Sequence, residues 1–212
     1  MRNDEKLTWS ALWKSPRTKW GIIFCIISIL ILVFYLPSYY GDVIQPKQGI
    51  YLNDVVLNLF TPYNWSILIF TLIYVSVAQT IFSVARFPSL ILLGLATYFA
   101  VSLIRMWTMY MVTLETPVDM ILLIDPISSL FYPTGTFAKD MFFSGHLSTM
   151  TVLVLVERKK WAKWVKAGFT LVIGILLAWQ HVHYTIDLVV APLVSIGVFY
   201  SLGNLLGVRI KV

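Results

Sequence analysis

The chain is poor in cysteine and in charge, and each shortage excludes a class of protein. Its 212 residues include one cysteine, Cys25, which excludes a disulfide framework and a cysteine-rich zinc site. Charged residues make up 12% of the chain, about half of the ~25% usual in a soluble domain. Hydrophobic residues make up 58%, which also excludes intrinsic disorder. The composition therefore predicts a membrane protein.

Long uncharged runs predict six transmembrane helices, and so an all-α, polytopic integral membrane fold. A helix needs about 20 apolar residues to cross a ~30 Å hydrocarbon core, where it satisfies its own backbone. A cleaved signal peptide is an alternative for the first run, but no small-x-small cleavage site follows it. The predicted helices cover residues 21–36, 65–84, 87–110, 142–156, 165–179 and 185–206. We expect residues 1–19 to form an interfacial segment and residues 20–212 a single membrane domain.

The distribution of lysine and arginine gives this fold an orientation. Thirteen of the 16 basic residues fall on one side of the predicted bundle. They lie in the N-terminal segment, at Arg86 between the second and third predicted helices, between the fourth and fifth, and in the C-terminal tail. Only Lys47, Arg105 and Lys139 fall on the opposite side. Cytoplasmic loops carry the excess of basic residues. Both termini are therefore predicted to be cytoplasmic.

The positions of these basic residues argue against nucleic-acid binding as the reason for the net charge of +6. They are spread over four separate segments beside tryptophans such as Trp9 and Trp161, which suit a membrane interface. Residues 8–20 resemble a basic interfacial helix. We expect contact with anionic lipid at the cytoplasmic surface, and no nucleic acid.

All three histidines fall at the opposite, outward ends of the predicted helices. His146 opens the fourth helix, while His181 and His183 precede the sixth. Arg105 and Asp187 lie at the same level. Because ionisable groups at membrane depth are costly, such a cluster predicts a functional site on the periplasmic, lumenal or extracellular face.

The spacing of His183 and Asp187 is chemically specific. Residues i and i+4 share one face of a helix, so the carboxylate can accept an imidazole N–H and fix the tautomer. The other ring nitrogen then becomes available as a base or nucleophile. A purely structural His–Asp pair is the alternative.

Ser144-Gly145-His146 strengthens the catalytic interpretation. A Ser-Gly pair at a helix start presents backbone N–H groups to an anion, and His146 can give a proton to a leaving oxygen. The alternative is a serine cap followed by a buried histidine. Arg105 suits bidentate contact with phosphate, although it could also snorkel to the interface. Together these residues predict a phosphoryl site.

Other polar residues leave alternatives open. Asp140 can cap the fourth helix or orient a partner. His146, His181, His183 and Asp187 are acceptable zinc ligands, but no HxxEH-type spacing occurs, so we expect no metal and no cofactor. The loop residues Glu115, Asp119 and Asp125 could attract a cationic head group or simply be solvated.

Three segments resemble the sphingomyelin synthase branch of the type-2 phosphatidic acid phosphatase superfamily. They are the arginine-led Thr-Met-Tyr segment 105–114, the Asp-aromatic-Ser-Gly-His segment 139–146, and His-Tyr-Thr-Ile-Asp at 183–187. No Arg-Pro pair occurs in the chain, and residues 177–182 contain no arginine. The superfamily's phosphatases usually carry a Lys-x6-Arg-Pro element and a Ser-Arg pair shortly before the histidine that corresponds to His183. The lack of both features favours the synthase branch.

The resemblance implies a six-helix enzyme with an outward-facing His-His-Asp triad. His183 would form a phosphohistidine, Asp187 would orient it, and His146 would act as acid and then base. The phosphate would contact Arg105, Ser144 and Gly145, with Asp140 and Tyr184 also expected in the substrate site. This predicts a lipid phosphotransferase that moves phosphoethanolamine or phosphocholine from a glycerophospholipid to a lipid alcohol such as ceramide.

Rival functions keep or discard this triad. A lipid phosphate phosphatase would use water as the acceptor. A transporter would use the histidines and Asp187 as a proton path, but six spans without an inverted repeat argue against it. A non-catalytic scaffold needs none of these residues. The sequence gives no oligomeric state.

Overall fold

The computed structural model describes residue 9, residues 16–126 and residues 139–208, and every regular element in that part of the chain is helical. One isolated parallel bridge, between Ile50 and Leu114, is the only β pairing among these residues. The α-helices are α2 (Pro16–Ser38), α3 (Ser66–Val84), α4 (Pro88–Met111), α6 (Gly145–Val156), α7 (Lys160–Trp179) and α8 (Thr185–Leu205). A π-helical turn, Tyr39–Ile44, continues α2, and a 3-10 turn covers Leu57–Leu59.

Five of these helices are long and apolar enough to cross a membrane, and α6 is a shorter apolar helix. This confirms the predicted all-α, multi-pass membrane fold. The N-terminal interfacial segment, 1–19, lies largely outside the described residues. Within it, Trp9 is exposed and its indole N–H donates to the carbonyl of Ala85.

Three helix starts differ from the prediction by three residues or more. The first helix begins at Pro16 rather than 21, so it takes in the end of the predicted interfacial segment. The fourth predicted helix begins at Gly145 rather than 142, because Phe142 has a φ of 42° and Ser144 caps the helix by accepting from the Leu147 N–H. The fifth begins at Lys160 rather than 165. Lysine is a good helix former, so the basic turn that looked like a loop continues the helix.

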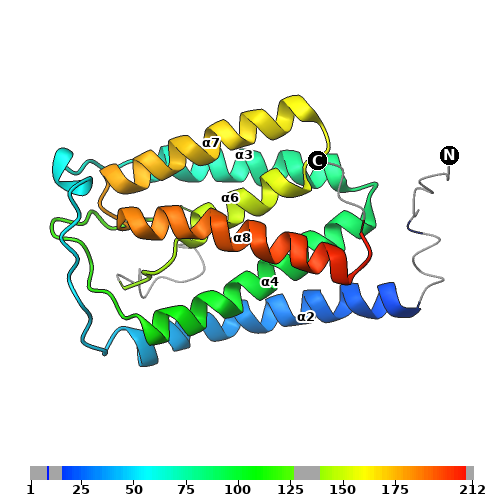
Figure 1. Cartoon of the computed structure of the whole chain (residues 1–212), viewed down its shortest axis with the longest axis horizontal. Coiled ribbons are helices and arrows are strands. Elements are labelled where there is room, and N and C mark those ends of the chain that lie inside the picture. Colours follow the sequence, from blue (N-terminus) through cyan, green and yellow to red (C-terminus); the bar gives the residue numbers. More distant parts are fainter. Residues whose placement is uncertain (1–8, 10–15, 127–138, 209–212) are drawn as a thin grey trace.

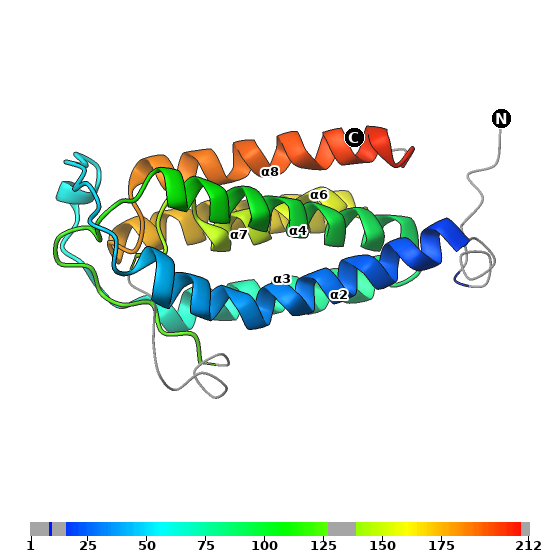
Figure 2. The ribbon, with the colours of Figure 1, turned by 90° about the horizontal axis from the view of Figure 1, so that it is seen from below.

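Helix α6 lies at the centre of the bundle. It packs against α3, α4, α7 and α8, while α2 packs against α4 at one edge. Figure 1 shows α7 and α3 along one side and α2 along the other, with α6, α8 and α4 between them. Seen from below, α8 lies on one face, and α2 and α3 lie on the opposite face (Figure 2). The largest core cluster accordingly combines residues of α3, α4, α6, α7 and α8.

Helix α6 is shorter than the helices it packs against. Its 12 residues rise about 18 Å, which is shorter than the ~30 Å hydrocarbon core. Helix α6 alone is therefore too short to cross that layer. The C-terminal end of α6 is tied to the basic end of α3 and α7, because Glu157 accepts from Ser83 and Lys166.

Loops close the opposite end of the bundle, which we call the site end. The segment that joins α2 to α3 lies there, beside the end of α4 and the start of α8 (Figure 1). Residues Ile50 and Leu114 form the bridge, with Ile50 donating to Thr113 and Glu115 donating back to Ile50. Gly49 is required at this crossing, because a Cβ there would lie 2.7 Å from the Glu115 nitrogen. Backbone hydrogen bonds therefore hold the loop between α2 and α3 across the site end.

A buried ion pair holds the basic end together. Lys166 Nζ lies 2.7 Å from Glu157 Oε2, and the two side chains are 3% and 0% exposed. Lys166 also contacts the Thr80 hydroxyl, and Glu157 accepts from the Ser83 hydroxyl and the Lys159 N–H. Three helices, α3, α6 and α7, therefore meet at one satisfied polar cluster.

Removal of one partner from this ion pair should destabilise the fold. Lys166→Met would leave the Glu157 carboxylate buried without its cation, and such changes cost about 3–5 kcal/mol. The double variant Glu157→Gln/Lys166→Met should recover most of that loss, because glutamine keeps a carbonyl oxygen for Ser83 and the backbone. Thermal unfolding in detergent measures both, and equal stability of the two variants would contradict the pairing.

The same carboxylate gives a pH dependence. Burial alone would raise the pKa of Glu157, but hydrogen bonds from Lys166, Ser83 and the backbone lower that pKa from 4.5 to about 2. Because the folded pKa is depressed, the ionised pair stabilises the fold fully above about pH 4.5 and loses its contribution as the pH falls towards 2. Glu157→Gln should remove this part of the acid sensitivity in unfolding curves measured against pH.

Candidate active site

A cavity of about 280 Å³ lies near the site end between α2, α3, α4 and α6. Its wall joins ionisable groups with aromatic and aliphatic side chains. Tyr98 lies seven residues before Arg105 on α4, so the cavity extends about 10 Å along that helix, away from the site end. The polar and aromatic side chains of the lining, together with Gly145, include Tyr40, Phe70, Tyr74, Tyr98, Arg105, Asp125, Asp140 and His146.

Arg105 points into the bundle rather than to its surface. Its Nε donates to the Phe143 carbonyl, Nη1 donates to the Tyr40 hydroxyl at 3.2 Å, and Nη2 is paired with Asp140. The side chain is only 11% exposed. These bonds use three of the five guanidinium N–H donors and hold its plane in a fixed orientation.

Asp140 is the counter-ion that makes this buried cation tolerable. Burial would raise the pKa of Asp140, but the Arg105 guanidinium outweighs that effect and the pKa lies below its usual range. Asp140 is therefore ionised at neutral pH. Of the two roles considered for it from the sequence, orienting a partner matches this geometry.

Gly145 lets the guanidinium approach the first turn of α6. A Cβ on Gly145 would lie 2.8 Å from Arg105 Nη1 and 3.0 Å from Cζ, closer than real contacts allow. The first N–H groups of a helix have no partner within it, and the helix dipole adds positive potential at that point. Arg105 and the start of α6 thus form one anion-attracting corner of the cavity wall.

His146 lies in that same first turn and faces the cavity. Its ring packs edge-on against Phe70, with centroids 5.6 Å apart, and its Nδ1 is enclosed without a hydrogen-bond partner among the described residues. A buried imidazole nitrogen without a partner is costly. It is therefore a position where a bound ligand can supply the missing hydrogen bond.

His183 and Asp187 lie beside His146 at the start of α8. The His146 and His183 ring centroids are 6.4 Å apart, and His183 Nδ1 lies 3.5 Å from Asp187 Oδ2. The two side chains are 1% and 0% exposed. Asp187 also accepts from the Tyr184 N–H at 3.3 Å, which fixes the carboxylate. The two side chains face one another, but His183 lies before the N-cap Tyr184 rather than on α8, so they do not share a helix face as predicted. At 3.5 Å, His183 Nδ1 faces the acid without a hydrogen-bond partner among the described residues.

Neither His183 nor Asp187 is among the residues that line the cavity. They lie behind the wall that His146 forms. Ser144 is likewise fully buried, where its side chain caps α6 and its N–H donates to the Asp187 carbonyl at 3.3 Å. Ser144 thus connects the α6 start to the α8 start.

Tyr184 was expected at the substrate site, but its side chain is directed to the loop between α2 and α3, which we call the covering loop. Its hydroxyl accepts from the Leu52 N–H at 3.3 Å, and its ring packs against Leu57, Leu114 and Met141. Asp54, which the sequence did not single out, caps the start of α8 by accepting from the Thr185 N–H at 2.6 Å. Both residues tie the loop over the His183 pair.

His181 also contacts the covering loop. Its Nδ1 lies 3.1 Å from the Val118 carbonyl oxygen, and its Nε2 lies 3.1 Å from that of Leu57. This ring is used to join two loops. Among the described residues, no group of three or more His, Cys, Asp or Glu side chains is arranged to hold a metal ion.

The acidic loop residues differ in their surroundings. Glu115 is paired with Lys139 at 2.8 Å and accepts from the Gly49 N–H, and these bonds lower its pKa. Asp119 is exposed. Asp125 alone of the three lines the cavity, where it accepts from the Tyr74 hydroxyl.

Sequence reasoning missed three further residues. Tyr40 and Tyr74 lie in apolar stretches of the sequence and have no distinguishing pattern around them. In the structure their hydroxyls contact Arg105 and Asp125, respectively. Gln180 is fully buried, where it accepts from the Trp65 N–H and donates to the Ser66 hydroxyl. A lone glutamine between two apolar helices was the available signal for this connection between α3 and the start of α8.

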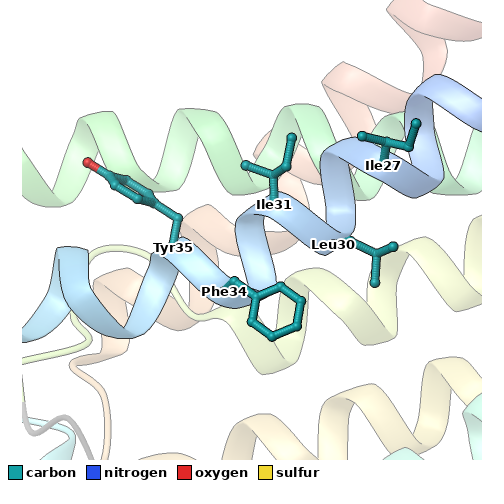
Figure 3. A pocket seen from close by; sticks show the side chains of 5 residues that line it. All are labelled: Ile27, Leu30, Ile31, Phe34 and Tyr35. Atoms are coloured by element: carbon teal, nitrogen blue, oxygen red, sulfur yellow. The ribbon is translucent and has the colours of Figure 1, made fainter.

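A second hollow lies on α2. Figure 3 shows it lined by Ile27, Leu30, Ile31, Phe34 and Tyr35, all from that one helix. Four of these five are aliphatic or phenyl side chains, and all five residues are more than 50% exposed. This hollow carries no group suited to catalysis and is what a lipid-facing helix surface provides.

Comparison with known proteins agrees with this geometry. Residues 139–204 match the family model described as PAP2 superfamily C-terminal. The match supports the type-2 phosphatidic acid phosphatase superfamily. The matched region includes the α6 start and the His183–Asp187 pair, while Arg105 lies outside it. The enzymes of that superfamily are phosphatases and phosphotransferases. The comparison with curated proteins gives no match.

Gly145→Ala tests whether the approach of Arg105 matters for activity. The added methyl would push the guanidinium away from the α6 start, and a misplacement of about 1 Å can lower a rate about a hundredfold. We expect a loss of that order in a lipid assay, with the melting temperature close to wild type. Gly168→Ala on α7 is the control, because nothing lies within 4 Å of its Cβ. Equal activity of the two variants would contradict the assignment.

Proposed function

We propose that the chain is an integral membrane lipid phosphotransferase of the sphingomyelin synthase type. It moves phosphoethanolamine or phosphocholine from a glycerophospholipid to a lipid alcohol such as ceramide. The donor phosphate contacts Arg105 and the first N–H groups of α6, where positive potential is already fixed. Two guanidinium N–H groups remain for phosphate oxygens beside the three used in protein contacts.

The transfer takes two steps. His183 Nε2 attacks phosphorus while the bond to the diacylglycerol oxygen breaks, and His146 gives that oxygen a proton. Asp187, facing Nδ1, stabilises the positive charge on the ring. The acceptor hydroxyl then gives its proton to His146 and attacks phosphorus, and the N–P bond breaks. His183 must come into contact with the phosphate that enters beside His146, whose ring is 6.4 Å away.

The enclosure of the histidine pair is the observation that carries transfer over hydrolysis. His183 and Asp187 are 1% and 0% exposed, and chain segments tied through Tyr184 and Asp54 cover them. The cavity beside them extends along α4, a helix long and apolar enough to cross a membrane. A lipid alcohol is concentrated within a membrane and water is scarce there, which favours the lipid as acceptor.

Lipid mass spectrometry tests the proposal. Purified protein is incubated with phosphatidylethanolamine, phosphatidylcholine, phosphatidic acid and ceramide. We expect a phospho-head-group on ceramide together with an equal amount of diacylglycerol. Free phosphate and diacylglycerol from phosphatidic acid alone would make the protein a lipid phosphate phosphatase, the alternative with water as acceptor.

His183→Ala should abolish every product in this assay, because no other step forms the phosphohistidine. The matched control is Ile186→Ala, since Ile186 lies three residues further along, in the first turn of α8, but is 45% exposed. The control should keep near-normal turnover. Persistent product in His183→Ala would overturn the nucleophile assignment.

A further inference from the structure

The cavity holds a second charged position besides the corner that Arg105 and the start of α6 form, which we call the phosphate corner. Asp125 lines it together with Arg105, and it comes from the loop that follows α4 rather than from a helix. Its carboxylate accepts a hydrogen bond from the Tyr74 hydroxyl, a residue two turns into α3. A negative group therefore lies on the α3 side of the cavity, while the guanidinium lies on the α4 side.

Aromatic rings line the same cavity, and one of them, Tyr74, contacts that negative group. Phe70 and Tyr74 stack with centroids 5.9 Å apart, and both line the cavity with Tyr40 and Tyr98. The faces of such rings attract alkylammonium groups, most strongly where water is excluded. A carboxylate in a cavity lined by aromatic rings is therefore suited to an organic cation.

We propose that Asp125 and Tyr74 form the subsite for the ammonium end of a zwitterionic head group, and so set the donor class of the enzyme. This rests on the proposed function and extends it to the choice of donor. The phosphate of the donor lies at Arg105 and Gly145, and its ethanolamine or choline cation lies at Asp125. Donors without a cation, such as phosphatidic acid, gain nothing from this subsite.

The geometry also gives Tyr74 a separate role. Its O–H donates to Asp125, which fixes the carboxylate against the α3 wall. Tyr74→Phe keeps the ring for contact with the cation but releases the carboxylate. Tyr74 is thus a positioning residue, whereas Asp125 contacts the head group itself.

The test separates binding from turnover. In an inactive His183→Ala background, affinities of dihexanoyl phosphatidylcholine, dihexanoyl phosphatidylethanolamine and dihexanoyl phosphatidic acid are measured by titration calorimetry. Asp125→Asn should weaken the two zwitterionic lipids about tenfold while phosphatidic acid binds as well as before or better. Tyr74→Phe should give a smaller loss in the same direction.

Asp119→Asn is the matched control. It removes the same charge from the same loop, but Asp119 is exposed and outside the cavity lining. Its φ of 59° is one that asparagine adopts readily. The control should leave all three affinities unchanged.

Two outcomes would overturn the subsite. One is an equal change for all three lipids in Asp125→Asn, which would indicate general damage to the cavity. The other is no change in any of them. Because binding is measured without catalysis, either result differs from failure of the transferase proposal, which would appear as absent transfer product in the wild-type lipid assay.

Discussion

The arrangement of the site depends on one constraint, the burial of a permanent cation against a helix start inside the bundle. Arg105 has no low-cost place there unless its donors and its charge are both satisfied. The Phe143 carbonyl, the Tyr40 hydroxyl and the Asp140 carboxylate meet that need. The absence of a side chain on Gly145 lets the guanidinium reach the α6 start.

The second element of the site depends on the covering loop. Asp54 and Tyr184 hold the chain between α2 and α3 across the start of α8, and Gln180 joins that start to α3. These contacts enclose His183 and Asp187 almost completely. The phosphate corner and the histidine pair are thus positioned by different contacts and meet at His146. That separation explains why the cavity wall contains His146 while His183 lies behind it.

Much of this could be predicted from sequence because the membrane imposes simple periods and lengths. Uncharged runs located the helices, and the scarcity of charge made Arg105, Asp187 and the histidines conspicuous. The start of α6 was misplaced by three residues because Phe142 and Phe143 are apolar and gave no sign of the positive φ that ends the loop. The start of α7 was misplaced because its first turn is basic.

The contacts between distant segments could not be predicted in this way. Tyr74 and Asp125 are 51 residues apart, and Tyr184 reaches Leu52 across 132 residues. Such pairs depend on how the helices pack, which periodicity does not encode. Tyr184 illustrates the consequence, because the tyrosine next to His183 in sequence directs its hydroxyl to the loop between α2 and α3 instead of the cavity.

Trapping the covalent intermediate tests the central claim most directly. Purified protein is mixed with a donor lipid labelled at its head-group phosphate, without acceptor, then quenched and mapped by peptide mass spectrometry. The account predicts a phospho-head-group on a ring nitrogen of His183, stable in base and labile in acid. Label on another residue, or steady transfer to ceramide with no covalent adduct in repeated traps, would contradict it.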